Sequence, residues 1–408
     1  MAHFVIIGAG ECGARAVFAL RQKGFDGDIT LVGSEPHAPY ERPPLSKAGL
    51  AGKADPKFVA AKDAYEAGRI RLLTGMTASG LDTAAHTVAL SDGSELAYDR
   101  LLLATGASAR AFPNAAGASS RIRSLRTYHD AVTLRAALQP GKRLAVIGGG
   151  FIGLEVAATA RQLGADVIIV EGLERVLKRA VPEDIARHIA ERHRAEGVDL
   201  RCGVSIESLA EQDGKAVIRL SCDEVIEADL ALVGIGARPN TALAEAAGIV
   251  IDNGIAVDDR LRTSAPDIFA AGDCCSFPLA LYGGRRVRLE SWRNAQEQGV
   301  LAAANMLGAD EPVSAVPWFW SDQYDMTLQI SGLADGAVTH LRRDLAEGAF
   351  ILFHLDAEGR LLAASGIGLG NAVARDIRLA EMLIAARAHP DPAALTASNV
   401  KLKTLLAA

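Results

Sequence analysis

Two copies of one glycine-rich signature, 140 residues apart, constrain the fold of this chain more than any other feature. The copies span Gly8–Gly13 and Gly148–Gly153, and their glycines are Gly8, Gly10, Gly13, Gly148, Gly150 and Gly153. Each copy follows an apolar run typical of a buried strand and opens a segment with the pattern of a helix. In that setting the first glycine makes a tight turn, the second lets the backbone approach a pyrophosphate, and the third packs helix against strand. Free N–H groups at the helix N-terminus then face the anion.

The duplication predicts an α/β fold with two Rossmann-like dinucleotide-binding domains. Strands are expected at 4–8, 29–32, 144–147 and 166–170, and helices at 11–23 and 151–163. Three further segments have the pattern of a strand and turn: 101–106, 230–240 and 268–273. From Pro317 the pattern changes to alternating segments at 327–330 and 349–355 and a helix at 372–386, which predict a small C-terminal α+β domain. Two dinucleotides held at once predict a protein that passes hydride between them.

Composition excludes several classes of protein. The chain has 408 residues, which suggests two or three domains. A net charge of −6 argues against a general affinity for nucleic acid. Without an 18-residue apolar run or a leader before Phe4, we expect no membrane span, no signal peptide and a cytoplasmic location.

Cysteine and histidine usage predicts neither disulfide exchange nor a metal site. The five cysteines form no C-x-x-C pair: Cys12, Cys202, Cys222, Cys274 and Cys275. The nine histidines do not cluster with them at metal-ligand spacing. Buried small side chains or loop thiols are therefore the expected roles of these cysteines.

Carboxylates after the second strand of each unit are candidate ribose ligands. Glu171 ends that strand in the second unit, where a carboxylate can accept both hydroxyls of an adenosine ribose and repel a 2′-phosphate. The sequence therefore favours NADH over NADPH, although Arg175 and Lys178 follow closely and partly offset the repulsion. In the first unit either Ser34 or Glu35 occupies the corresponding place, and Glu35 is the better acceptor.

Other residues admit a functional and a structural interpretation. Lys47 closes the proline-punctuated segment Pro36–Lys47, which cannot be regular helix or sheet, and is either a cation near a flavin or a surface lysine. Asp273 could bind a ribityl hydroxyl or cap a helix. Glu155 is placed in the first turn of the second helix, where the macrodipole favours a carboxylate.

Two aromatic or basic clusters are similarly ambiguous. Trp318 and Trp320 either pack in a core or place a ring over a flavin face. The patch Arg285, Arg286 and Arg288 is either a solvated loop or a docking site for an acidic partner.

Five motifs together resemble a known family: Arg42–Lys47, Leu103–Gly106, Gly148–Ala157, Ala271–Asp273 and Pro317–Gln323. The chain resembles the FAD-dependent, NADH-using ferredoxin reductases of the putidaredoxin reductase and biphenyl dioxygenase reductase type, with apoptosis-inducing factor as a distant relative. The resemblance implies a glutathione-reductase-like architecture. Its domains would be an FAD domain at 1–108 and 234–316, an NADH domain at 109–233 and a C-terminal domain at 317–408.

The resemblance also implies roles for individual residues. The first loop would line the FAD pyrophosphate through Gly8, Gly10, the backbone of Cys12, and Gly13. Other implied FAD or nucleotide contacts are Arg42, Lys47, Ala78, Thr105, Gly106, Arg126, Gly236, Asp273 and Trp292. Lys47 would pair with Glu155 beside flavin N5, and Trp320 would lie near the flavin on the path of electrons. Family members often carry an acid where this chain has Ser34, so Glu35 takes over that ribose contact in our interpretation.

The predicted function is electron transfer from NADH through FAD to a [2Fe-2S] ferredoxin that serves a Rieske-type oxygenase or a cytochrome P450. The ferredoxin would be a separate, transient, acidic partner, because no iron–sulfur cysteine spacing lies in the chain. We expect a monomer with no membrane attachment. Two alternatives remain: an NADH-dependent flavin enzyme with another acceptor (rubredoxin, monodehydroascorbate or a quinone) and a non-catalytic NADH-sensing module.

Overall fold

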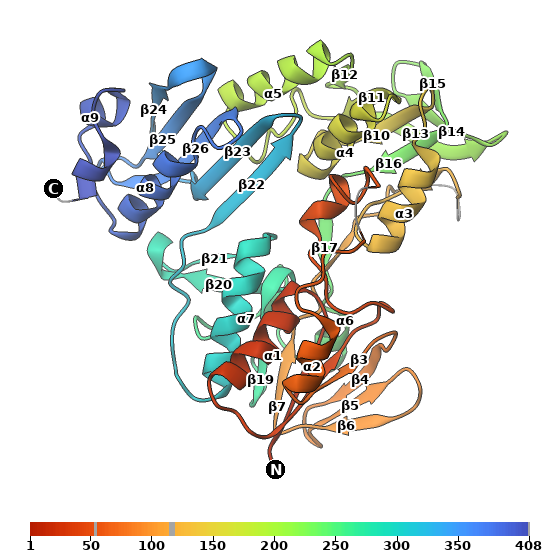
Figure 1. Ribbon diagram of the computed structural model, residues 1–408, viewed down its shortest axis with the longest axis vertical. Helices are drawn as coiled ribbons and strands as arrows, with labels where there is room; N and C mark the ends of the chain where they lie inside the picture. Colours follow the sequence, from red (N-terminus) through yellow and green to blue (C-terminus); the bar gives the residue numbers. More distant parts are fainter. Residues whose placement is uncertain (53–54, 114–118, 407–408) are drawn as a thin grey trace. The chain divides into compact units, whose positions relative to one another are not determined.

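The computed structural model describes residues 1–52, 55–113 and 119–406 (Figure 1). The chain divides into two compact units, each assembled from separate stretches of sequence. The first unit consists of Met1–Glu41, Pro56–Ser108 and Arg238–Phe319. The second consists of Arg42–Asp55, Ala109–Ala237 and Trp320–Ala408. Among the residues described, no helix is both long and apolar enough to cross a membrane.

A five-stranded parallel sheet forms the centre of the first unit. Its strands, in spatial order, are β19 (Ile268–Ala270), β7 (Arg100–Leu103), β1 (His3–Ile7), β2 (Asp28–Val32) and β3 (Ile70–Leu73). The chain leaves β1 through α1 (Glu11–Gln22) and returns in β2, while β7 joins β1 on its other side. This reversal of strand order at β1 is where open α/β sheets bind ligands, and the first glycine loop lies there.

Helices and small sheets complete the first unit. Helix α7 (Trp292–Met306) packs against α1 despite its distance in sequence, and the two lie side by side in Figure 1. Antiparallel strands form two further sheets: β4 (Ala78–Asp82), β5 (Thr87–Leu90) and β6 (Glu95–Ala97), and β20 (Cys275–Leu279) with β21 (Arg285–Val287) and the short parallel β18 (Ile255–Ala256). The short helices are α2 (Lys62–Ala67), α6 (Ala242–Ala246), and the 3₁₀ turns Gly272–Cys274 and Ala280–Tyr282.

The second unit repeats the parallel sheet. Its order is β12 (Asp199–Cys202), β11 (Asp166–Glu171), β10 (Arg143–Ile147), β16 (Leu230–Val233) and β9 (Ile122–Arg123). Helix α4 (Phe151–Gln162) connects β10 to β11, and α5 (Glu183–Ala195) connects β11 to β12. Helix α3 (Tyr128–Ala137) begins with a capping box between Thr127 and Asp130. Strand β10 therefore occupies the position that β1 has in the first unit, and the second glycine loop follows it.

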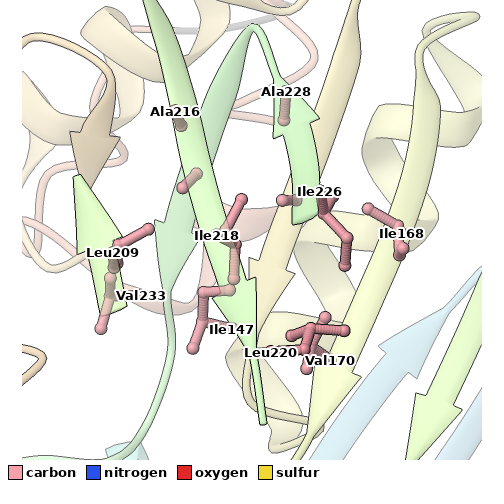
Figure 2. Close-up of a cluster of buried hydrophobic side chains, with 12 residues drawn as sticks. Ile147, Ile168, Val170, Leu209, Ala216, Ile218, Leu220, Ile226, Ala228 and Val233 are labelled. Carbon is pink, nitrogen blue, oxygen red and sulfur yellow. The ribbon is translucent and has the colours of Figure 1, made fainter. Parts of the chain in front are cut away.

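An antiparallel sheet covers one face of this second parallel sheet. Its strands are β13 (Ile206–Gln212), β14 (Lys215–Leu220) and β15 (Val225–Ala228). Their side chains Leu209, Ile218 and Ile226 form one buried cluster with Ile147 and Val170 of the parallel strands (Figure 2). The alternating burial along β14 follows from the two-residue period of a strand that packs on one face only.

The second unit also contains the C-terminal sheet. The sheet has the order β22 (Trp318–Gln323), β23 (Met326–Gly332), β26 (Leu361–Leu369), β25 (Phe350–Leu355) and β24 (Thr339–Asp344). Helix α8 (Ala374–Ala385) packs on β26 and β23, and α9 (Pro392–Thr396) packs on β24. The remaining elements are β8 (Ala107–Ala109) paired with β17 (Ala237–Pro239), and 3₁₀ turns at Pro43–Ser46, Ala346–Gly348 and Leu402–Leu406.

The structure confirms the predicted fold class, with some corrections to its elements. The segment Pro36–Lys47 contains a short 3₁₀ helix at Pro43–Ser46, because a proline is tolerated in the first turn, where its missing N–H has no partner to lose. The strand expected to reach Asp273 ends at Ala270, and a 3₁₀ turn at Gly272–Cys274 follows it. The three-domain boundaries stay a prediction, and residues 53–54, 114–118 and 407–408 of those ranges lie outside the described residues.

One buried histidine, His354, makes the stability of the C-terminal sheet depend on pH. His340 and His354 face each other across β24 and β25, with their Nδ1 atoms 2.9 Å apart. Burial, with His340 as a second cause, lowers the pKa of His354 from 6.5 to about 4. Above pH 6.5 the imidazole is neutral in the folded and unfolded states alike. Below pH 6.5 the imidazole binds a proton in the unfolded chain but not in the folded protein. The free energy of unfolding therefore decreases as pH falls toward 4.

We therefore expect the free energy of unfolding to fall by about 3 kcal/mol between pH 6.5 and 4 through this residue. Urea unfolding midpoints at pH 7 and pH 5 measure the effect in the native protein and in His354→Gln. The variant should lose much less stability on acidification, whereas His129→Gln, at an exposed position, should behave as the native protein does. Equal losses in all three proteins would contradict the assignment.

Candidate functional site

The outer glycines of both signature loops stand where a side chain cannot fit. Gly8 has φ +120°, and a Cβ there would lie 2.0 Å from the carbonyl oxygen of Ala104. A Cβ at Gly13 would lie 2.0 Å from the carbonyl oxygen of Gly8. In the second loop the corresponding distances are 2.6 Å from Gly148 to the Gly234 oxygen and 2.3 Å from Gly153 to the Gly148 oxygen. These four glycines are required by the close approach of strand, turn and helix.

The middle glycines stand in open space instead. No heavy atom of the described residues lies within 4 Å of a Cβ built on Gly10, and for Gly150 the nearest is the Gly234 oxygen at 3.7 Å. Both residues are N-caps without a side-chain hydrogen bond, directly before α1 and α4. Helix N–H groups therefore face a space that protein atoms do not fill, which fits the pyrophosphate of a bound dinucleotide at each loop.

Glu171 is the last residue of β11, as the sequence predicts, and its carboxylate contacts the second loop. Its Oε2 accepts the N–H of Gly149 at 2.6 Å, and its Oε1 accepts the N–H of Leu173 at 2.8 Å. Since a carboxylate has about four acceptor positions, Glu171 keeps acceptor capacity beside the loop for ribose hydroxyls.

The first unit places both ribose candidates after β2. Ser34 is exposed, and Glu35 is half-buried and accepts a hydrogen bond from the Tyr40 hydroxyl. The choice between Ser34 and Glu35 as ribose ligand stays a prediction.

Lys47 and Glu155 form the ion pair at the centre of the second unit's polar cluster. The Nζ of Lys47 lies 3.0 Å from Oε2 of Glu155, whose side chain is 5% exposed. The hydroxyls of Ser46 and Ser321 donate to the two carboxylate oxygens at 2.5 and 2.7 Å. A buried carboxylate is stable only when it is paired and hydrogen-bonded in this way, so the pair and the two hydroxyls depend on one another.

The position of Glu155 corrects the reason given for it from the sequence. Helix α4 begins at Phe151, so Glu155 lies beyond its first turn. The end effect of the macrodipole falls off within that first turn and cannot account for the residue. The Lys47 ammonium and the serine hydroxyls account for it instead.

The segment that carries Lys47 is fixed by hydrogen bonds to its neighbours. Thr159 of α4 donates its hydroxyl to the carbonyl of Ser46 at 2.8 Å, and Arg42 donates to the carbonyl of Arg126 at 2.6 Å. The Lys47 ammonium lies 5.8 Å from the Trp320 ring centroid. The indole N–H of Trp320 donates to Asp322 at 2.9 Å. The structure thus brings together Arg42, Lys47, Arg126, Glu155 and Trp320 in the second unit.

The remaining predicted contacts of the first unit lie at turns and element ends. Thr105 exchanges two hydrogen bonds with Asn240, through its hydroxyl at 2.7 Å and its carbonyl at 2.8 Å. Asp273 lies inside the 3₁₀ turn Gly272–Cys274, whose N-cap is Ala271, so its structural alternative as a helix cap is wrong. Ala78 begins β4, Trp292 begins α7, and Gly106 has positive φ, as does Gly236 of the second unit. Trp318 begins β22, with Arg293 over its ring.

The basic patch is partly neutralised by its own neighbours. Arg286 donates to the carbonyls of Ser276 and Val257 at 2.6 and 3.0 Å, and Arg288 pairs with Glu290. Arg285 is exposed and lies against the Tyr282 ring. Arg285 and Arg286 are exposed, and Arg288 is half-buried.

The three buried cysteines are not activated as thiolate nucleophiles. All five are free thiols, and Cys12, Cys274 and Cys275 are buried. Burial raises the pKa of Cys12 and Cys275 well above the usual range of a thiol and also raises that of Cys274. In the part of the chain that is described, no group of His, Cys, Asp and Glu has the arrangement of a metal site.

Three further residues of the polar cluster lie within the motifs Arg42–Lys47 and Pro317–Gln323, but the sequence predicted no role for them. They are Ser46, Ser321 and Asp322. A signal was present in β22, where Ser321 and Gln323 are buried on one face of a strand that is otherwise half-exposed. Polar residues at a two-residue period on a buried face indicate a hydrogen-bond network.

Comparison with known proteins gives one consistent result. Residues 2–299 match the family described as pyridine nucleotide-disulphide oxidoreductase, and residues 318–406 match the reductase C-terminal family. The chain is 43% identical over 99% of its length to the ferredoxin–NAD(+) reductase component of an anthranilate 1,2-dioxygenase system from Burkholderia cepacia, covering 99% of that protein. It is 40% identical over its whole length to putidaredoxin reductase of Pseudomonas putida, covering 97% of it. The structure of a covalent putidaredoxin reductase–putidaredoxin complex matches with a TM-score of 0.94 and 38% identity, covering 100% of this chain and 98% of that one.

The glycine geometry predicts opposite outcomes for two alanine substitutions in the first loop. Gly10→Ala should leave the fold intact, since its methyl meets no protein atom, but should weaken dinucleotide binding at least about tenfold by filling the cradle. Gly13→Ala should instead destabilise the protein because its methyl clashes with the Gly8 carbonyl. Circular dichroism and chromatography of nucleotide released from the purified proteins measure both effects. Full dinucleotide content in folded Gly10→Ala would contradict the cradle.

Proposed function

The chain belongs to the pyridine nucleotide-disulphide oxidoreductase family, and from that premise we propose that it is an NADH-dependent, FAD-containing ferredoxin reductase. The observation that carries the proposal is the pair of glycine loops, each with closed outer glycines and an open middle one. Full-length similarity to ferredoxin–NAD(+) reductases supports the choice of acceptor. The buried, protonated thiols argue against disulfide exchange by this member of the family.

FAD is assigned to the first loop and NADH to the second. The residues proposed to hold FAD are Gly8, Gly10, Cys12, Gly13, either Ser34 or Glu35, Arg42, Lys47, Ala78, Thr105, Gly106, Arg126, Asp273 and Trp292. Those proposed to hold NADH are Gly148, Gly150, Gly153, Glu155, Glu171 and Gly236. When bound, the flavin supplies the redox chemistry, which is hydride acceptance from NADH and release of single electrons.

The protein's own groups position and tune this chemistry. Lys47 presents an ammonium, which favours negative charge that develops nearby. Glu155 fixes that ammonium at 3.0 Å and limits its net effect. Trp320, beside Lys47, is proposed to lie on the path of electrons out of the site. Hydride transfer needs no general base, so this positioning is the whole contribution asked of these residues.

The partner proposed for the reduced enzyme is a separate [2Fe-2S] ferredoxin. The patch of Arg285, Arg286 and Arg288 is the proposed docking surface, because it is a basic cluster on a chain of net charge −6. The ferredoxin would deliver electrons to a Rieske-type oxygenase or a cytochrome P450. Monomeric state and cytoplasmic location stay predictions.

Reduction of cytochrome c by NADH, with and without an added [2Fe-2S] ferredoxin, tests the proposed function. We expect NADH to bleach the flavin rapidly and the rate of cytochrome c reduction to rise to saturation with ferredoxin concentration. The control is the same ferredoxin without its cluster. Rapid bleaching that no ferredoxin couples to cytochrome c would assign another acceptor, and failure of NADH to bleach the flavin would favour the NADH-sensing alternative.

Glu171 should set the preference for NADH over NADPH. In Glu171→Ala we expect the ratio of kcat/KM for the two nucleotides to narrow about tenfold, because the charge that repels a 2′-phosphate and the acceptor for ribose hydroxyls are both lost. Steady-state kinetics with each nucleotide measure the ratio. Glu207→Ala, which removes an exposed carboxylate of β13, is the matched control and should leave the ratio unchanged. An unaltered ratio in Glu171→Ala would show that another residue contacts the ribose.

A further inference from the structure

The Lys47–Glu155 pair is one end of a longer hydrogen-bonded chain of side chains. Ser321 donates to Oε1 of Glu155 at 2.7 Å, and the Gln323 amide donates to Ser321 at 3.2 Å. The other side of that amide, Oε1 of Gln323, lies 2.9 Å from Nε2 of His193. The Nδ1 of His193 lies 3.2 Å from the Tyr324 hydroxyl. This series of hydrogen bonds thus runs from Tyr324 to the Glu155 carboxylate through residues of β22 and α5.

The chemistry of its members gives this chain one direction. A carboxylate only accepts, so the Ser321 hydroxyl must donate to Glu155 and can only accept from the Gln323 amide. The amide oxygen only accepts, so His193 must carry its proton on Nε2. A neutral imidazole then has an acceptor at Nδ1, which the Tyr324 hydroxyl satisfies. The tautomer of His193 is thereby tied to the charge of Glu155 through two intervening side chains.

Burial and backbone geometry show that this end of the chain is held in place. His193 is fully buried, and Gln323 and Ser321 are almost so. Tyr324 has φ +58°, in the left-handed region that a bulky residue rarely adopts. That conformation places its hydroxyl on the histidine. The two-residue turn between β22 and β23 requires such a backbone, and it holds Tyr324 beside the histidine.

Burial favours the neutral imidazole that this direction requires, because the charges of Arg192 and Glu196 act on His193 in opposite directions. Arg192, its neighbour on α5, pairs with Asp325 at 2.5 Å and with Glu196 at 2.8 Å, so its own charge is largely balanced. Arg161 of α4 donates to the carbonyl of Glu196. Burial is the main cause that lowers the pKa of His193, and it outweighs the hydrogen bond to Gln323.

We propose that His193, Gln323 and Ser321 are positioning residues that hold Glu155 as the ionised partner of Lys47. Their donors all point toward the carboxylate and fix which of its oxygens faces Ser321 and which faces Lys47. This rests on the proposed function in so far as Lys47 acts on a bound flavin. The chain of contacts itself lies wholly in the second unit and needs no bound group.

The tautomer of His193 tests the inference independently of electron transfer. In the FAD-loaded enzyme labelled with ¹⁵N-histidine, two-bond ¹H–¹⁵N spectra distinguish the Nε2–H from the Nδ1–H form, and His193→Gln assigns the signal. We expect the Nε2–H form in the native protein and in Ser321→Thr, which keeps the hydroxyl. In Ser321→Ala the link to Glu155 is cut, and a mixture of tautomers should appear.

Kinetics of flavin reduction by NADH provide the second measurement. Ser321→Ala should slow reduction about tenfold, the loss of one hydrogen bond to a charged group, with the Kd for NADH unchanged. Ser321→Thr should restore most of the rate. Ser331→Ala, which removes a buried hydroxyl from the neighbouring strand β23, is the matched control and should be as fast as the native enzyme.

Three outcomes separate this inference from the proposed function. An Nδ1–H tautomer in the native protein, or a tautomer that Ser321→Ala leaves unchanged, overturns the directed chain. A tautomer that behaves as expected while Ser321→Ala reduces flavin at the native rate overturns the positioning role. A protein with the expected tautomers that fails to reduce any ferredoxin leaves the chain intact and contradicts only the proposed function.

Discussion

A carboxylate buried in a protein interior is costly unless a cation and hydrogen-bond donors surround it, and Glu155 imposes that requirement on three separate parts of the second unit. The proline-rich segment must bring Lys47 and Ser46, β22 must bring Ser321, and α4 must present the acid beyond its first turn. Removing any one partner leaves a buried charge poorly compensated. The ion pair therefore fixes the geometry of the segments around it as much as it serves the chemistry proposed for it.

The two glycine loops use the same three glycines to join a strand to a helix and to leave space beside the helix N-terminus. In each loop a side chain at the first or third glycine would clash with protein atoms. A side chain at the middle glycine would instead fill the space proposed for a dinucleotide pyrophosphate. The two loops differ in what surrounds them. Glu171 reaches back to the second loop through the N–H of Gly149, whereas Glu35 is engaged by Tyr40. The two loops thus share their glycine geometry and differ in the carboxylate that lies at or after the end of the second strand.

Much of the fold could be predicted because its signals are local. Strands β1, β2, β10 and β11, helices α1 and α4, and the change of pattern near Pro317 are all legible from periodicity and glycine spacing. The pairing of Lys47 with Glu155 was available only through family resemblance, and the local argument for Glu155 was wrong because it placed the residue one turn too early. The chain from Glu155 to His193 could not be predicted, since α5 and β22 meet only through tertiary packing. The choice between Ser34 and Glu35 as the ribose ligand could not be predicted, because the two residues are adjacent and the end of the strand is predicted only to within one residue.

The interrupted order of the first unit has a consequence for how the protein is made. Strands β7 and β19 are hydrogen-bonded neighbours, yet all of the second parallel sheet lies between them in sequence. As the polypeptide leaves the ribosome, β10, β11, β12 and β16 are complete before β19 and α7 exist. The second parallel sheet can therefore form while the first sheet still has an open edge and α1 still lacks its partner helix α7. During this stage of synthesis the open sheet edge is exposed, and a chaperone that shields it would prevent the most misfolding.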